Sequence, residues 1–104
     1  MFWNVEAMTG YKPQTSFWQD FSIADSFGTS AIRDTFNRAF AEWKGNYIYL
    51  TELVMVLNHK LWQHYESGAE SFAKLYDELW RTASAYACEN LTGDELSYYF
   101  RVTD

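Results

Sequence analysis

The chain has 104 residues and a single cysteine, Cys88, so it can form one hydrophobic core but no intrachain disulfide, and we expect a reducing, cytoplasmic location. Its 14 acidic residues against 8 basic ones disfavour direct binding to the phosphates of nucleic acids; from Trp62 onward there are eight acids but only three bases. No run of about 18 uncharged apolar residues occurs, so no membrane-spanning helix is expected.

The first fourteen residues show little periodicity and contain the only proline, Pro13, which predicts a loosely structured N-terminal arm over residues 1–14. Phe2 and Trp3 are candidate anchors of this arm. The opening residues lack the basic region and apolar stretch of a secretion signal. Residues 15–104 are expected to form a single helical domain.

The first predicted helix runs from about Ser16 to Ser26. Gly28 follows it, as glycine often follows the last residue of a helix. Its apolar stripe consists of Phe17, Phe21 and Ala24.

A second helix is predicted over about residues 30–44, with Thr29 or Ser30 as its cap. Its inward side chains should be Ile32, Phe36, Ala39, Phe40 and Trp43. On the opposite side, opposite charges alternate every four residues, which is typical of a solvated face rather than a site. This ladder consists of Asp34, Arg38 and Glu42.

The longest apolar segment, YIYLTELVMVL, begins after Gly45 and Asn46. Its β-branched residues would suit a strand, but its apolar face continues at helical spacing for four turns, which predicts a third helix. That face contains Leu50, Leu53, Val54, Leu57, Leu61 and Tyr65. A second apolar stripe, formed by Ile48, Met55 and Trp62, is typical of the central helix of a bundle; otherwise the stripe is an interface.

Two segments match the capping box, in which a Ser or Thr and a later Glu satisfy free backbone N–H groups. These segments are Ser67-Gly68-Ala69-Glu70, which should start a fourth helix, and Thr92-Gly93-Asp94-Glu95, which should start a short final one. The apolar faces are Phe72, Leu75, Tyr76, Leu79, Ala83, Tyr86 and Ala87 in the fourth helix and Leu96, Tyr99 and Phe100 in the final helix. Expected charge pairs are Glu70–Lys74, Lys74–Glu78 and Asp77–Arg81. The predicted fold is all-α, a compact four- to five-helix bundle around an antiparallel hairpin of the third and fourth helices.

The sequence offers little for catalysis or cofactor binding. His59 and His64 are five residues apart, so they do not share the helix face that a His-x-x-x-His zinc pair needs, and no metal site or cofactor is predicted. His64 should be a hydrogen-bonded histidine at the core or its boundary, whereas His59 should lie on the polar side near Glu52 and Gln63. Cys88 is interpreted as a spectator thiol. An enzyme or metal protein using His59, His64, Glu52 and a carboxylate of the fourth helix is the least favoured hypothesis.

Aromatic side chains are abundant, with eight Phe, eight Tyr and five Trp. A domain of this size cannot easily enclose all of them, so several should lie at its boundary. There they are either half-buried, with the polar tip in water, or part of a patch that binds a protein partner or a second copy. The candidate interaction residues are Trp18, Tyr49, Met55, Trp62, Trp80 and Tyr98.

Four segments carry a family resemblance: TSFWQDFSIADSFG, AIRDTFNRAFAEWK, YLTELVMVLNHKLWQHYE and ELSYYFRVTD. Over about Tyr11 to Asp104 the chain resembles a family of short proteins of unknown activity associated with integrative and conjugative elements of anaerobic Gram-positive gut bacteria. The resemblance implies a mobile-element accessory that acts inside a bacterial cell, and residues 1–10 then look like an additional or alternative start. It implies no site residue.

The expected function is therefore that of a non-enzymatic protein–protein interaction accessory. The alternative hypothesis is an anti-defence inhibitor whose acidic C-terminal half occupies the basic nucleic-acid groove of a restriction or CRISPR nuclease. The same negative charge can also be explained by solubility alone, since excess charge discourages self-association.

Overall fold

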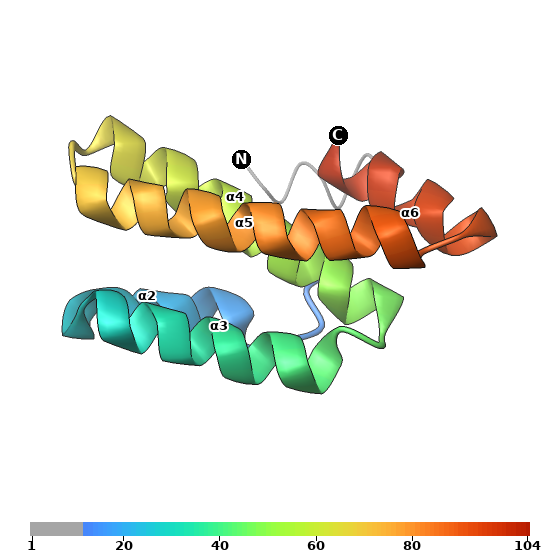
Figure 1. The fold of residues 1–104 in the computed structure, drawn as a ribbon, viewed down its shortest axis with the longest axis horizontal. Helices are drawn as coiled ribbons and strands as arrows, with labels where there is room; N and C mark the ends of the chain where they lie inside the picture. Colours follow the sequence, from blue (N-terminus) through green and yellow to red (C-terminus); the bar gives the residue numbers. More distant parts are fainter. Residues whose placement is uncertain (1–11) are drawn as a thin grey trace.

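The computed structural model describes residues 12–104, which form five helices and no strand. The helices are α2 (Phe17–Phe27), α3 (Thr29–Trp43), α4 (Tyr47–Glu66), α5 (Glu70–Asn90) and α6 (Gly93–Thr103). Figure 1 shows α2 and α3 as one layer beneath the long hairpin of α4 and α5, with α6 beside that hairpin. The predicted all-α bundle is confirmed. Residues 12–14 have no regular secondary structure, and the rest of the predicted arm, with Phe2 and Trp3, lies outside the described residues.

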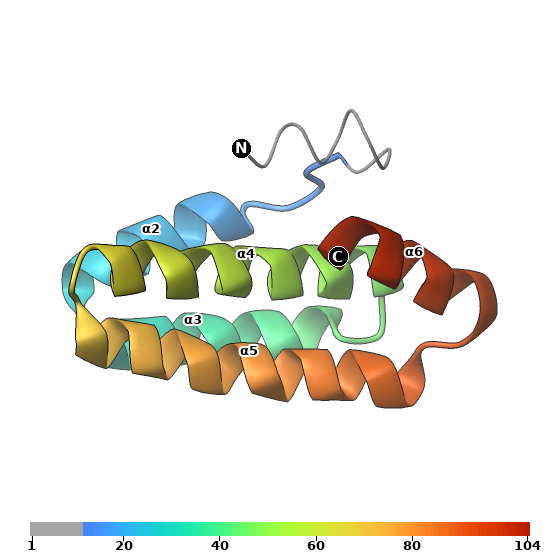
Figure 2. The ribbon, with the colours of Figure 1, turned by 90° about the horizontal axis from the view of Figure 1, so that it is seen from above.

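Helix α4 is the centre of the bundle, because it contacts each of the other four described helices. Figure 2 shows α2 near one end of α4 and α6 near the other. The buried apolar side chains of α4 are Leu50, Leu53, Val54, Val56, Leu57 and Leu61. Burying each such side chain contributes roughly 1.5–3 kcal/mol, which outweighs the small helix penalty of the β-branched residues. The prediction of a central helix is confirmed.

Gly28 is the single residue between α2 and α3, and it adopts φ 113° and ψ −176°. Its N–H donates to the carbonyl of Ala24 and its own carbonyl accepts from the N–H of Ile32, so it ends one helix and begins the next. The prediction that Thr29 or Ser30 caps the second helix is therefore wrong. Thr29 is already the first residue of α3, and no side chain caps that helix.

The capping box predicted at Ser67 is also wrong. Gly68, at φ 81°, ends α4 in a left-handed turn in which the N–H of Ala69 donates to the carbonyl of His64. Ser67 belongs to this turn, because its hydroxyl donates to the same carbonyl of His64. Ala69 is therefore the N-cap of α5. Thr92 is the N-cap of α6 as predicted, but its side chain makes no capping hydrogen bond.

Two predicted core aromatics are exposed, Tyr65 and Phe100. In the last turn of α4 the core side is taken by His64, whose ring stacks on Tyr76, so Tyr65 points outward. In α6 the buried residues are Tyr99 and Val102, which rotates Phe100 out of the core. The remaining predicted core residues are buried or half-buried.

The three predicted charge pairs on α5 are only partly formed. Glu70–Lys74 and Asp77–Arg81 are present, with N–O distances of 4.0 Å and 3.0 Å. Glu78 instead pairs with Arg33 of α3 at 2.7 Å.

Candidate functional site

The position of α2 on the bundle is set at its start by Glu52, a fully buried carboxylate of α4. Its side chain accepts hydrogen bonds from the backbone N–H of Gln14, at 2.6 Å, and of Thr15, at 3.1 Å, and from the Thr15 hydroxyl. The Thr15 hydroxyl oxygen in turn accepts from the N–H of Phe17. Glu52 therefore ties the segment before α2 to α4, and it is not the polar-side neighbour of His59 that the sequence predicted.

A second, partly buried polar cluster holds the other end of α2. Asp25 of α2 accepts from the Lys60 ammonium at 2.9 Å and from the Tyr76 hydroxyl at 2.5 Å, and its carboxylate lies 3.1 Å from Nε2 of His64. Ser22 also accepts from Lys60 at 3.0 Å. The cluster joins α2, α4 and α5, and the predicted hydrogen-bonded boundary role of His64 is confirmed.

These polar groups satisfy one another, and of the described residues that form the two networks only Gln14, Thr15 and Phe17 line either of the two surface grooves described below. Burial, together with the hydrogen bond to Asp25, raises the pKa of Tyr76 far above its ordinary value, so the phenol stays neutral and donates. Within residues 12–104 no three His, Cys, Asp or Glu side chains come together as a metal site would require. His59, His64 and Glu52 point to different places, since Asp25 holds His64 and the Thr15 segment holds Glu52. We therefore treat both clusters as structural.

The larger surface groove has a volume of about 850 Å³ and is built from four helices. We call it the tryptophan groove. Its aromatic and apolar wall consists of Trp18 from α2, Val54, Met55 and Trp62 from α4, Trp80 from α5, and Tyr99, Phe100 and Val102 from α6. Its polar rim consists of Asn58, His59, Gln63, Glu66, Ser84, Cys88, Thr103 and Asp104. No Lys or Arg is found among these described lining residues.

Helix periodicity explains how α4 reaches this groove with one side and the core with the other. Met55 and Trp62, seven residues apart, form the second apolar stripe, which points away from the buried face. Trp62 is 57% exposed and its ring stacks on Tyr65, with 5.8 Å between ring centroids. The ring of Trp18 meets His59 edge-on at 5.1 Å, and desolvation there lowers the pKa of His59, so this ring is neutral near pH 7.

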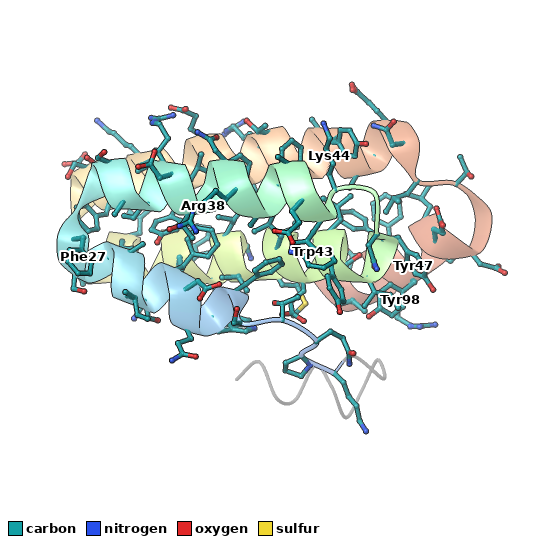
Figure 3. The ribbon with its side chains drawn as sticks, turned by 90° about the horizontal axis from the view of Figure 1, so that it is seen from below. Phe27, Arg38, Trp43, Lys44, Tyr47 and Tyr98 are labelled. Carbon is teal, nitrogen blue, oxygen red and sulfur yellow. The ribbon has the colours of Figure 1, made fainter. Side chains whose placement is uncertain are left out.

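Four of the six predicted interaction residues meet in the tryptophan groove: Trp18, Met55, Trp62 and Trp80. The other two lie elsewhere. Tyr49 packs its ring against Trp43, with centroids 4.6 Å apart, at a different groove. Tyr98 packs edge-on against Tyr47, 5.4 Å away, and both appear together in Figure 3. Cys88 is exposed, as predicted for a spectator thiol, but it also lines the tryptophan groove.

A second groove of about 620 Å³ lies between α2 and α3, on the face seen in Figure 3. We call it the α2–α3 groove, and it shares no described lining residue with the tryptophan groove. Its lining residues are Gln14, Thr15, Ser16, Phe17, Asp20, Ile23, Ala24 and Phe27 from the segment through α2; Ala31, Asp34, Thr35, Arg38, Ala39, Glu42 and Trp43 from α3; and Tyr49 from α4. Apart from Tyr49, sequence reasoning did not assign these residues to a site. The available signal was Ile23 and Phe27, two large apolar residues outside the predicted stripe of their helix.

No helix in the described part of the chain combines the length and hydropathy needed to cross a membrane. No protein-family model, curated protein or solved structure matches the chain. The site must therefore be interpreted from its own chemistry.

Proposed function

We propose that this protein is an interaction accessory whose tryptophan groove binds an apolar, amphipathic helix of a partner protein. The observation that carries the proposal is the convergence of Trp18, Met55, Trp62 and Trp80 from three helices on one groove. Large aromatic side chains and methionine are enriched at protein interfaces, and a few such residues supply most of the binding energy. The sequence resemblance to mobile-element proteins supports a partner inside the bacterial cell.

The chemistry of the groove favours a helix over a charged ligand. Its wall is aromatic and aliphatic, while its rim offers amide and hydroxyl groups from Asn58, Gln63 and Ser84 that suit the polar flanks of an amphipathic helix. Glu66 and Asp104 are the charged carboxylates among the lining residues, with no Lys or Arg beside them, so a partner with an acidic flank is disfavoured. Within residues 12–104 no three His, Cys, Asp or Glu side chains gather as a metal site would require, and the carboxylates of Glu52 and Asp25 accept hydrogen bonds from within the fold.

A pull-down from a lysate of the host cell, washed at low and high salt, tests the proposal. Trp62→Ala should abolish recovery of the partner or weaken binding by about tenfold or more, the range of an interface hot spot. Because Trp62 is 57% exposed, its truncation should leave the fold intact, which a circular-dichroism melt would check. Phe27→Ala, in the α2–α3 groove, is the matched control and should leave this partner bound.

Cys88 allows a second test without removing a side chain that lines the groove. It is an exposed thiol on the groove rim, and the chain has no other cysteine. A bulky maleimide on Cys88 should block the partner, whereas a small methylthio group should not. Retained binding to both Trp62→Ala and the maleimide adduct would reject the groove as the site. Sizing of the purified protein alongside would show whether a second copy is the partner.

The alternative of an inhibitor that occupies a basic nuclease groove has less support. Glu70, Asp77 and Glu78, three of the eight acidic residues from Trp62 onward, are paired with Lys or Arg. These pairs reduce the free negative charge that would replace a nucleic acid. A partner recovered only at low salt, with nuclease activity lost in the complex, would favour the inhibitor over the interaction accessory.

A further inference from the structure

The α2–α3 groove is open to solvent on the face that Figure 3 presents. Phe27 lies at the end where α2 turns into α3, Arg38 lies midway, and Trp43 lies toward the other end. The lining positions on α2 are Ser16, Phe17, Asp20, Ile23, Ala24 and Phe27, and on α3 they are Ala31, Asp34, Thr35, Arg38, Ala39 and Glu42. Both sets follow helical spacing over about three turns, so each helix presents one continuous side to the groove.

The groove has small apolar side chains at its base and two large, exposed apolar side chains on α2. Ala24 and Ala39 are buried at its base, and Ala31 is half-buried. Small side chains at these positions leave room for another helix to approach closely. Two large apolar side chains on α2 are exposed to solvent, Phe27 at 78% and Ile23 at 50%, and Phe27 has the largest exposed fraction of any large apolar side chain within residues 12–104. Exposure of this kind costs free energy in water unless a partner covers it.

Charge around the groove identifies the partner's chemistry. Three carboxylates line it, Asp20, Asp34 and Glu42, against one cation, Arg38. Asp34, Arg38 and Glu42 are exposed, and no ion pair joins them to one another or to any other described side chain, although four-residue spacing would allow it. Within the described part of the chain, the Asp20 carboxylate accepts only from the nearby Ser16 hydroxyl. Acidic groups thus lie on both helices at the edges of an apolar floor.

We infer that the α2–α3 groove is a docking surface for a basic amphipathic helix of another protein. Leucine-sized side chains of that helix cover Phe27 and Ile23, and its Lys or Arg side chains pair with Asp34 and Glu42. The inference does not rest on the tryptophan groove, because the two grooves share no described lining residue. An apolar floor whose rim carries an excess of one charge, here three carboxylates against Arg38, favours a helix of opposite charge.

Two synthetic peptides of about four helical turns test the inference. Both carry leucine and alanine along one face, and they differ only in flanking residues, which are lysine in the first and glutamate in the second. Titration of the full chain, followed by backbone amide chemical shifts, should show binding of the lysine peptide with shifts confined to α2 and α3. Phe27→Ala, and separately the double variant Asp34→Lys with Glu42→Lys, should each weaken that binding by about tenfold at low salt.

Matched controls separate this surface from the rest of the protein. Trp62→Ala should bind the lysine peptide within about twofold of the unaltered chain, and so should Asp94→Lys with Glu95→Lys, which makes the same change of net charge on α6. Four results would each overturn the inference. They are equal affinity for the two peptides, chemical-shift changes that map to the tryptophan groove, no detectable binding of the lysine peptide, and a loss of affinity in the α6 control equal to that in the α3 variant. A lysine peptide that binds while Trp62→Ala abolishes the lysate partner would support both surfaces independently.

Discussion

The placement of α2 is expected to depend on one buried ion pair, and Asp25→Asn tests this. Asp25 receives the Lys60 ammonium, the Tyr76 hydroxyl and Nε2 of His64, so one carboxylate connects three helices. Asparagine preserves the size of the side chain and can still accept from Tyr76. It cannot neutralise Lys60, whose other hydrogen-bond partner within residues 12–104 is the hydroxyl of Ser22. The variant therefore leaves an ammonium group buried without a counter-charge.

The magnitude follows from the burial of the pair. The Lys60 side chain is 6% exposed and that of Asp25 is 17% exposed, so water can screen the uncompensated charge only slightly. Removing one member of a buried pair typically costs about 3–5 kcal/mol. Because Asp25 retains some access to water, we expect the lower end, about 3 kcal/mol. For a domain of this size each 1 kcal/mol lowers the melting temperature by about 4–8 °C, so the decrease should be about 12–24 °C.

Urea denaturation of a double-mutant cycle is the assay. Lys60→Met should cost less than Asp25→Asn, because His64 and Tyr76 continue to donate to Asp25. The double variant should lose less unfolding free energy than the two single variants lose in sum, by at least about 1 kcal/mol. The reason is that methionine removes the charge that Asp25→Asn leaves unpaired. Asp34→Asn, an exposed carboxylate without an ion pair, should change stability by no more than about 0.5 kcal/mol. Additive single costs, or a loss below about 1 kcal/mol for Asp25→Asn, would refute the reasoning.

Three further predictions concern the joints of the fold. Glu52→Gln should lower the free energy of unfolding by about 2–3 kcal/mol, because charge-assisted hydrogen bonds from Thr15 to a fully buried carboxylate are lost. Hydrogen exchange of the Thr15 amide should accelerate, and unchanged exchange would contradict the role of Glu52 in tying this segment to α4. Gly28→Ala should lower the free energy of unfolding by about 1–3 kcal/mol in a thermal melt, because a residue with a side chain is strained at φ 113° even though the space around it is open. Gly45→Ala, at a position without a positive φ, should be neutral or slightly stabilising. Equal effects of the two substitutions would argue against backbone strain at Gly28. Burial raises the pKa of Tyr99 to about 12 from 10.0, so its contribution to stability is fully present below pH 10 and is lost as pH rises toward 12. Tyr99→Phe should therefore flatten the plot of melting temperature against pH over that range. An unchanged slope would disprove the link between this pKa and stability.

The periodic features of the sequence predicted the fold well. The apolar stripes of α2, α3 and α5 coincide with buried or half-buried residues, and the two-stripe pattern of α4 correctly identified the central helix. These predictions depend only on the 3.6-residue repeat, which any stable packing of the helix must respect. The same logic placed Met55 and Trp62 on a second stripe, expected to be covered by neighbouring helices or else to be an interface, and both residues line the tryptophan groove.

The failed predictions for polar side chains have a physical cause, which is that their partners are decided only when the chain turns and the helices pack. Ser67 matched a capping box, yet it belongs to the end of α4 because Gly68 turns the chain first. Glu52 was placed on a polar side of its helix, yet it is fully buried because backbone N–H groups of Gln14 and Thr15 meet it. Neither Thr15 nor Asp25 carried a sequence signal for its partner on α4, more than thirty positions away.

Local spacing alone thus determined the helices and their buried faces except at Tyr65 and Phe100, because hydrophobic periodicity acts within a few turns of one helix. The composition determined the surplus of aromatic side chains. Only the tertiary structure decided which surplus residues meet. It brought Trp18 and Trp80 to Met55 and Trp62, and it left Tyr49 and Tyr98 at other places. It also brought Asp20 of α2 together with Asp34 and Glu42 of α3 around the α2–α3 groove, because a groove lined by two helices exists only once they have packed.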